Sequence, residues 1–410
     1  MTASHLESKG RGGALSGVRV IDLSAYLAGP YGCTLLADMG ATVIKVEPPS
    51  GDNSRAYPSS LTGAPRGFLG LNRGKKGLVL DLKTDEGVGL LHRLATTADV
   101  LVHNFRPGVA QRLRIDFDTL SAANPRLIYC NLTGYGKTGP LSQQPGFDQV
   151  LQTFSGICEM QGSPDGPPQI VSGSIVDYSA AYMMALGVAS ALFHRERTGQ
   201  GQEVDVSLLG SALAMQSARL VHADNESCDA IKEFGSGGIT GLHPTRDGWL
   251  YLSANTPHFW RSLCEIIDLK ELGEDPRYDT IRKRAAAAGE LVPQVRAALM
   301  ARTALEWEAR FGERVPGVAA RNLLDMFEHP QVLAQDMIGR FEYPGAGSYR
   351  AFQNPIGFSA SPCPQAFGAP ALGQHSQEIL AEIGIEGAEF ERLLNGGILG
   401  AVPVAGPTRA

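Results

Sequence analysis

Strand-like and helix-like segments alternate through the first 135 residues, and this alternation constrains the fold more than any other feature of the chain. Short apolar runs are separated by longer segments that carry helix start and stop signals. Parallel strands need crossover connections, usually helical, so the alternation predicts an α/β fold with an open parallel sheet. The predicted strands are residues 18–23, 41–47, 77–82, 99–103 and 126–132, and the predicted helices are 31–39, 84–94, 109–113 and 117–122.

Composition places the chain among ordinary globular proteins and leaves room for two domains. It has 410 residues, of which 43% are hydrophobic and 19% charged. The net charge of −6 argues against a general nucleic-acid-binding protein. The cysteines and histidines are dispersed, without CxxC or HExxH spacing, so we expect free thiols in a reducing compartment and no metal site.

The sequence pattern also bears on location. No run approaches the length of a membrane span, and residues 1–14 lack the apolar stretch of a secretory signal. We therefore expect a cytoplasmic protein with no membrane partner, or one in an organelle matrix if the tail is a targeting segment. Residues 1–16 and 401–410 are predicted to be disordered tails, and residues 222–234 a polar linker.

Candidate ligand contacts follow the predicted strands, because open α/β sheets bind ligands at the carboxyl ends of their strands. Neither GxGxxG nor GxxxxGK[ST] occurs there, so NAD and P-loop nucleotide sites lack their usual signatures. Four basic side chains do occur there, namely Lys83, Arg106, Arg112 and Lys137. They suit a phosphorylated ligand, although a solvated surface charge is the default interpretation of each one taken singly.

A single carboxylate, Asp177, lies in an apolar, small-residue run where a Ser/Gly turn precedes a long predicted helix. Asp is strongly preferred as a helix N-cap, and free backbone N–H groups at a helix start hold a carboxylate ionised. Asp177 is therefore either a cap or a reactive carboxylate. Asp148 is interpreted as a cap at the entry to an earlier helix. The glycine-rich residues 235–238 form either a passive connector or a mobile lid.

Eight short motifs occur in a fixed order between Gly17 and Ile383, at residues 17–30, 40–48, 71–78, 104–108, 124–128, 134–140, 197–201 and 372–376. Together they resemble the class III CoA-transferase family, which includes formyl-CoA transferase, carnitine CoA-transferase and α-methylacyl-CoA racemase. The resemblance implies an interlocked homodimer. Each chain would have a Rossmann-like large domain, built from N- and C-terminal parts, and an inserted small α+β domain.

The implied domain boundaries are residues 17–221 and 336–400 for the two parts of the large domain and 235–335 for the small domain. The resemblance places CoA on the large domain, with contacts from Leu80, Lys83, Asn104, Phe105, Arg106, Arg112, Lys137 and Phe147. It assigns the active-site loop and pocket to Tyr26, Leu27, Gly235, Gly237 and Gly238.

The resemblance further implies that Asp177 is a nucleophile. CoA would move from an acyl-CoA donor to a carboxylic acid through an aspartyl anhydride and an aspartyl-CoA thioester, with no metal or redox cofactor. Backbone N–H groups at the helix start would stabilise the developing oxyanions, and the glycine loop would shield the anhydride from water.

Two alternatives remain open at this point. The racemase branch pairs the equivalent Asp with a His, but this chain has Phe147 there, and Thr256 replaces a Glu of the racemases. Since acid–base chemistry needs a titratable side chain, these departures favour a transferase. A non-catalytic CoA-binding subunit is the other alternative. Phe147 and Leu27 replace the Tyr and Gln of formyl-CoA transferase, which favours a larger acid, such as a dicarboxylate with an apolar segment.

Overall fold

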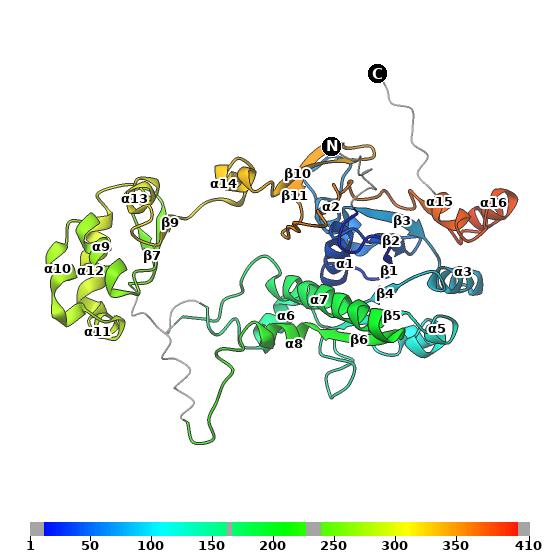
Figure 1. Cartoon of the computed structure of the whole chain (residues 1–410), viewed down its shortest axis with the longest axis horizontal. Helices are drawn as coiled ribbons and strands as arrows, with labels where there is room; N and C mark the ends of the chain where they lie inside the picture. The colour runs from blue at the N-terminus through cyan, green and yellow to red at the C-terminus, as the bar shows by residue number, and fades with distance from the viewer. Residues whose placement is uncertain (1–11, 162–165, 227–238, 401–410) are drawn as a thin grey trace, which may run out of the picture. The chain divides into compact units, whose positions relative to one another are not determined.

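The structure is a computed structural model that describes residues 12–161, 166–226 and 239–400 (Figure 1). It divides into two compact units, one formed by residues up to 220 and from 331 onward, the other by residues 221–330. The glycine residues Gly235, Gly237 and Gly238, most of the predicted linker and most of both predicted tails lie outside the described residues.

The first unit contains a six-stranded, fully parallel sheet with the strand order β3-β2-β1-β4-β5-β6. This is the order of the doubly wound dinucleotide-binding fold. The prediction of an α/β fold with an open parallel sheet is therefore confirmed. The strands are β1 (Arg19–Asp22), β2 (Thr42–Glu47), β3 (Lys75–Val79), β4 (Val100–His103), β5 (Ile128–Thr133) and β6 (Gln202–Ser207).

Helices and one hairpin complete this unit. Its helices are α1 (Ala28–Asp38), α2 (Arg66–Asn72), α3 (Asp85–Ala95), α4 (Val109–Arg112), α5 (Phe117–Ala123), α6 (Asp148–Phe154), α7 (Ile175–Thr198), α8 (Leu208–Ala214), α15 (Ser376–Ala381) and α16 (Gly387–Asn395). The strands β10 (Ile338–Tyr343) and β11 (Gly347–Phe352) pair as an antiparallel hairpin. A single 3₁₀ turn, η1 (Asn53–Ala56), follows β2.

The second unit has a three-stranded antiparallel sheet in the order β7-β8-β9. Its elements are β7 (Gly241–Pro244), β8 (Trp249–Leu252), β9 (Gly317–Ala319), α9 (Pro257–Ile266), α10 (Lys270–Glu274), η3 (Pro276–Tyr278), α11 (Ile281–Ala286), α12 (Ala288–Leu299), α13 (Ala304–Phe311) and η4 (Leu323–Phe327). The helix α14 (Pro330–Ala334) spans the boundary between the units in sequence.

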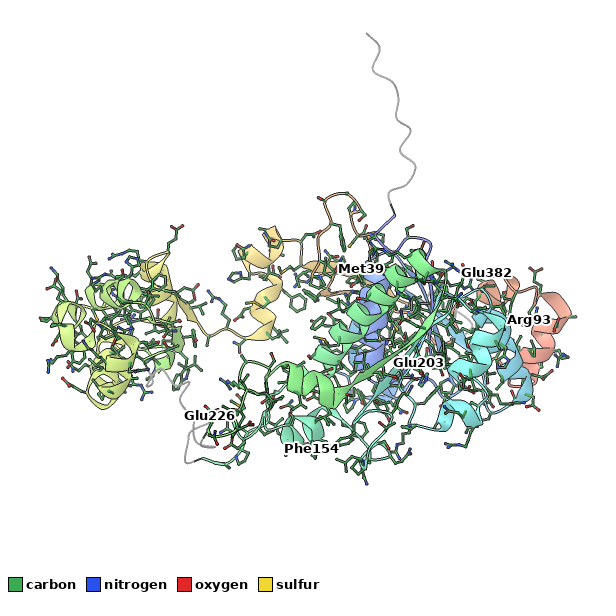
Figure 2. All side chains as sticks on the ribbon, turned by 60° about the horizontal axis from the view of Figure 1, so that its bottom comes forward. Met39, Arg93, Phe154, Glu203, Glu226 and Glu382 are labelled. Carbon is green, nitrogen blue, oxygen red and sulfur yellow. The ribbon has the colours of Figure 1, made fainter. Side chains whose placement is uncertain are left out.

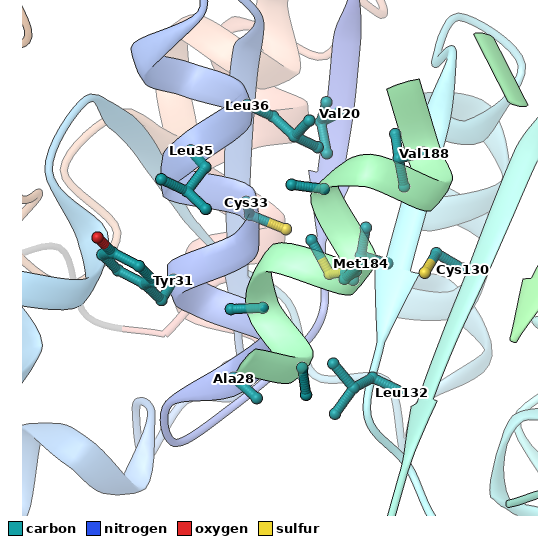
Figure 3. Packing of buried hydrophobic residues seen from close by; sticks show 14 of the residues in the cluster. Val20, Ala28, Tyr31, Cys33, Leu35, Leu36, Cys130, Leu132, Met184 and Val188 are labelled. Atoms are coloured by element: carbon teal, nitrogen blue, oxygen red, sulfur yellow. The ribbon is translucent and has the colours of Figure 1, made fainter. Parts of the chain in front are cut away.

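Helices cover both faces of the parallel sheet, because successive side chains along each strand point to opposite faces. Val20 packs in a cluster with α1 and α7 (Figure 3), whereas Ile21 packs in a second cluster with α3 and the C-terminal helices α15 and α16. Backbone bonds fasten the C-terminal segment to the same sheet, since His375 N donates to Gly77 O at 2.9 Å. Arg93 on α3 also donates to the carbonyl of Ile383. Figure 2 labels Arg93 and Glu382, which precedes Ile383 in the chain.

The packing of α1 against α7 depends on a glycine. A Cβ on Gly32 would lie 2.3 Å from Cε of Met184 and 3.1 Å from the carbonyl oxygen of Ala181, so a larger residue would require Met184 to move and the two helices to adjust. Figure 3 shows Met184 between Cys33 of α1 and Cys130 of β5.

The helix α7 is long and apolar enough to cross a membrane, judged by its length and composition alone. The expectation that no run approaches the length of a membrane span was therefore wrong. The core helix of a soluble protein passes the same test.

The helix α8 begins at Leu208, because the Ser207 hydroxyl accepts a hydrogen bond from Gly210 N at 3.0 Å and caps it. The helix α2 was not predicted at all. Its seven residues include two glycines, Gly67 and Gly70, which weaken any helical signal.

A buried ionic network ties the end of β1 to the neighbouring strands. Asp22 is fully buried, and its Oδ2 accepts a hydrogen bond from Nζ of Lys75 at 2.8 Å. The same ammonium group donates to Pro30 O at 2.7 Å and to Oδ1 of Asn72 at 2.8 Å. Burial alone would raise the pKa of Asp22, but the ammonium groups of Lys45 and Lys75 outweigh it, and the net pKa is lowered.

Lys45 extends this network to the loop after β1. Its Nζ lies 2.9 Å from Oδ2 of Asp52 and donates to the carbonyl of Ser24. The other oxygen of Asp52 accepts a hydrogen bond from Tyr26 N at 3.3 Å. The loop at the carboxyl end of β1 is therefore held by charges that are themselves buried.

Replacing Asp22 by Ala tests this network. The change leaves two buried ammonium groups with one carboxylate fewer, and we expect it to lower the free energy of unfolding of the large unit by about 3–5 kcal/mol. Urea unfolding, with hydrogen exchange of the β1 amides as the local readout, measures the loss. Breaking the exposed Arg392–Glu86 pair of the same unit with Arg392→Gln is the control, with an expected change below about 1 kcal/mol. An equal loss in both variants would contradict the stabilising role of the network.

Candidate active site

A cavity of about 340 Å³ opens at the carboxyl ends of the central strands. Its walls come from the loops after β1 and β4, the end of β5, the start of α8 and the first turn of α7. The sheet order reverses between β1 and β4, which is where doubly wound sheets bind ligands. The lining residues are 25–28, 104–107, 132–134, 142, 144–147, 177 and 208.

The loop after β1 is fixed to the loop after β4 by one side-chain amide. Oδ1 of Asn104 accepts from Ala25 N at 2.9 Å, and its Nδ2 donates to Ala25 O at 2.7 Å. The next residue, Tyr26, has a φ of 70°, a strained conformation for a side chain of this size. Its ring meets Phe147 edge-on, with the ring centroids 5.8 Å apart. Asn104 therefore positions the wall of the cavity.

Asp177 is the third residue of α7 and does not cap it. The N-cap is Ser174, and neither side chain makes a capping hydrogen bond. The cap is Asp148 instead, whose Oδ2 accepts from Val176 N at 2.7 Å and from Asp177 N at 3.0 Å. The interpretation of Asp177 as a cap was therefore wrong. Asp148 does cap a helix, but the helix is α7 rather than the one that Asp148 itself begins.

This arrangement leaves the Asp177 carboxylate without stabilising partners. It is half-buried, and no hydrogen bond or ion pair reaches its side chain from the residues that the structure describes. Burial, and then the nearby Asp148 carboxylate, raise the pKa of Asp177 to about 7. The expectation that the helix-start N–H groups keep Asp177 ionised and receive an oxyanion was therefore wrong for Val176 and Asp177, since both donate to Asp148.

A second cavity, of about 670 Å³, also reaches Asp177. The two cavities share four lining residues, Tyr26, Leu27, Phe147 and Asp177. The second is completed by Tyr57, by α2, by the first turn of α6 and by Ser174 and Tyr178. The Asp177 side chain thus lines both cavities, and so do the rings of Tyr26 and Phe147, which meet edge-on.

Comparison with known proteins identifies the family. The model of CoA-transferase family III matches residues 15–376. The chain belongs to CoA-transferase family III.

Curated relatives of the chain are CoA-transferases. The succinate–glutarate CoA-transferase of Agrobacterium fabrum is 33% identical over 386 residues, which cover 90% of this chain and 95% of that protein. The acetyl-CoA:oxalate CoA-transferase of Acetobacter aceti is 35% identical over 388 residues, covering 90% and 96%. The crystal structure of Rv3272 from Mycobacterium tuberculosis superposes with a TM-score of 0.79 at 32% identity, covering 90% of this chain and 99% of that one.

Among the residues predicted to form the CoA-transferase site, the structure gathers seven around these cavities, namely Tyr26, Leu27, Asn104, Phe105, Arg106, Phe147 and Asp177. It places three others elsewhere. Leu80 is 1% exposed and packs in the core under α3, while Lys83 and Arg112 are exposed and line neither cavity. The assignment of these three side chains to CoA stays a prediction.

Lys137 lies beside a smaller cavity of about 200 Å³ that shares Phe105 and Arg106 with the first. Its ammonium group is 2.6 Å from Glu203 and 3.2 Å from Asp205. Two carboxylates therefore already neutralise this lysine, and a CoA phosphate would have to compete with them.

Several lining residues were not predicted from the sequence. Arg66 and Gly70 lie on the unpredicted helix α2, and Tyr57 follows the 3₁₀ turn η1. Two polar side chains of the first cavity, Ser142 and Gln144, come from the segment before α6. No motif marks these residues. Within the described part of the chain no group of three or more His, Cys, Asp or Glu is placed to hold a metal ion.

The raised pKa of Asp177 predicts a pH-dependent effect on stability. A carboxyl that ionises near 3.8 when unfolded and near 7 when folded destabilises the fold as pH rises between those values, and the cost stays constant above 7. We therefore expect Asp177→Asn to match the wild-type chain near pH 4 and to be more stable by about 2 kcal/mol above pH 7, after allowing for partial exposure.

Urea unfolding across this pH range measures the difference. The exposed carboxylate of Asp118, on α5, provides the control, since Asp118→Asn should run parallel to wild type through the same range. A constant difference between Asp177→Asn and wild type from pH 4 to 8 would show that Asp177 does not titrate in this window.

Proposed function

We propose that the protein transfers CoA from an acyl-CoA thioester to a carboxylic acid, with Asp177 as the covalent carrier. The observation that carries this proposal is the unpartnered, half-buried Asp177 carboxylate at the junction of two cavities. A nucleophile that must meet CoA on one side and an acid on the other needs this kind of placement. The CoA-transferase names of the relatives support the general reaction.

The steps follow from the chemistry of carboxylates, which are poor electrophiles until they are activated. The Asp177 carboxylate attacks the thioester carbonyl of the donor, the C–S bond breaks, and CoA leaves as the thiolate while a mixed anhydride forms between Asp177 and the donor's acyl group. The thiolate then attacks the aspartyl carbonyl, releasing the donor acid and leaving an aspartyl-CoA thioester. The acceptor carboxylate attacks that thioester, its C–S bond breaks, and CoA leaves as the thiolate while a second mixed anhydride forms between Asp177 and the acceptor. The thiolate then attacks the acceptor's carbonyl in this anhydride, which gives the acceptor's CoA thioester and releases the Asp177 carboxylate.

The environment of Asp177 suits the first step. A carboxylate stripped of hydrogen-bond donors is a stronger nucleophile than a solvated one, and its pKa near 7 leaves much of it ionised at neutral pH. Once Asp177 is acylated its charge is lost, so the repulsion from Asp148 that raises its pKa disappears. The acylated state is therefore favoured relative to the ionised one.

Asp148 also bears on the racemase alternative, because it is the nearest second carboxylate. Its Oδ2 accepts two backbone hydrogen bonds from α7, and its Oδ1 accepts one from Nε2 of Gln152 at 2.5 Å. A side chain with both oxygens engaged in structure is a poor partner for a proton shuttle. With Phe147 at the expected histidine position, the transferase reaction is the better supported.

We also propose that the protein acts as a homodimer, in the interlocked form that its family resemblance implies. The helix α7 presents four exposed apolar side chains, Tyr182, Met183, Leu186 and Phe193. One side of α7 packs in the core, and exposed apolar side chains on such a helix favour a protein interface over contact with solvent. Sedimentation of the full chain at micromolar concentration tests this assembly.

The central prediction is that Asp177→Ala loses transfer by about 10⁴-fold or more, since a nucleophile is removed. A panel of acyl-CoA donors is incubated with carboxylic acids, and new thioesters are detected by mass. With donor alone, hydroxylamine should convert Asp177 of the wild-type chain to a hydroxamate that peptide mass spectrometry locates.

Asp118→Asn is the matched control and should keep both the turnover and the hydroxamate. Full activity in Asp177→Ala would overturn the proposal. Exchange of the α-proton with deuterated water, in the absence of any acceptor acid, would instead establish a racemase.

A further inference from the structure

The second cavity has an apolar wall and one cationic corner. Its aromatic and aliphatic surface comes from Tyr57, Leu71 and Tyr178. Three charged side chains line it, namely Asp177, Asp148 and Arg66. The Asp148 carboxylate is negative and already accepts two hydrogen bonds at the start of α7, so it does not attract an anion. Arg66 is then the group in this cavity that can attract an anion.

Arg66 differs from the other arginines close to it in the chain. Arg55 pairs with Glu47 at 2.7 Å, and Arg73 pairs with Asp38 at 2.5 Å. The Arg66 guanidinium donates to Oγ of Ser60 at 2.9 Å, and no carboxylate of the described residues pairs with it. Most of its N–H donors are therefore available to a ligand, in the fork that binds a carboxylate through two hydrogen bonds.

Space for such a ligand lies next to the guanidinium. Gly70 is one helical turn after Arg66 on α2, so both residues lie on the same face of that helix. A Cβ built on Gly70 meets no atom within 4 Å. Because glycine has no side chain, Gly70 leaves open volume beside Arg66 in this cavity.

We propose that Arg66 is a specificity-determining residue that selects dicarboxylic acids and their half-thioesters. The inference rests on the proposed function, in which the acid's reacting carboxylate meets Asp177. Its remote carboxylate pairs with Arg66, and the methylene segment between the two lies on the apolar wall. A monocarboxylic acid of the same length fills the same volume but leaves Arg66 unpaired, so it binds less well.

Paired substrates of matched length test this assignment. The ratio of kcat/KM for succinate over butyrate, and for glutarate over valerate, is measured with wild-type protein, Arg66→Gln and Arg66→Lys. A charge-assisted hydrogen bond between Arg66 and the remote carboxylate should make kcat/KM about tenfold to hundredfold higher for the dicarboxylate than for the monocarboxylate. We expect this ratio in the wild-type protein for at least one of the two substrate lengths. In Arg66→Gln the ratio should fall close to one, mainly through the dicarboxylate, and Arg66→Lys should lie between them.

The exposed Arg282 on α11 supplies the control, and Arg282→Gln should keep the wild-type ratio. A ratio near or below one for both substrate pairs in the wild-type chain overturns the assignment, as does a ratio that Arg66→Gln leaves unchanged. The hydroxamate at Asp177 separates this failure from failure of the proposed function. If the hydroxamate forms but the wild-type protein shows no preference for dicarboxylates, the carrier role of Asp177 stands and the proposed role of Arg66 is wrong.

Discussion

The site depends on one interaction, the hydrogen bonding of Asp148 to the start of α7. By accepting from Val176 N and Asp177 N, Asp148 takes the donors that would otherwise stabilise the carboxylate of Asp177. It also places a second negative charge nearby, which adds to burial in raising the pKa of Asp177 to about 7. One carboxylate thus binds the start of α7, while the other stays without a partner among the described residues and has a raised pKa. The packing of α7 against the parallel sheet offsets the loss of stability that this unpartnered carboxylate causes.

The two cavities explain why such a carboxylate is useful. A CoA thioester and a carboxylic acid cannot exchange CoA directly, because the acid must first be activated. Asp177 lines both cavities, together with the edge-on rings of Tyr26 and Phe147, so in the proposed reaction it would meet a ligand in either one. Tyr26 is also connected to the strand ends, because its backbone N–H donates to Asp52 and Asp52 pairs with Lys45. Lys45 in turn lies 3.9 Å from Asp22 at the end of β1. The parallel sheet therefore fixes the geometry that the proposed chemistry needs.

Much of this fold was predictable from the sequence, because continuous apolar strands and strong helix signals define the parallel sheet. Thr84 caps α3 through Gly87 N, and Gly199 ends α7 with a φ of 75°, as their residue types indicated. The ordered motifs also indicated the family and singled out Asp177. These features are local, or depend on residues in a fixed order along the chain.

The details of the site were less predictable, because they depend on contacts distant in sequence. Asp148 caps a helix that begins 27 residues later, and no local pattern reveals which backbone N–H groups it binds. Arg66 lies on a short glycine-containing helix with a weak signal. Leu80 points into the core, although its position in a family motif suggested a ligand contact. Side-chain direction and long-range capping were the parts that the sequence alone left undetermined.

The account's central claim is that an oxygen of Asp177 takes part in each transfer. An acceptor acid labelled with ¹⁸O in its carboxylate tests this directly. If the anhydride forms, one labelled oxygen stays on Asp177 when the thiolate takes the acyl group, and the peptide that contains Asp177 becomes heavier after turnover. Label that never appears in that peptide, in a chain that turns over, would contradict the account.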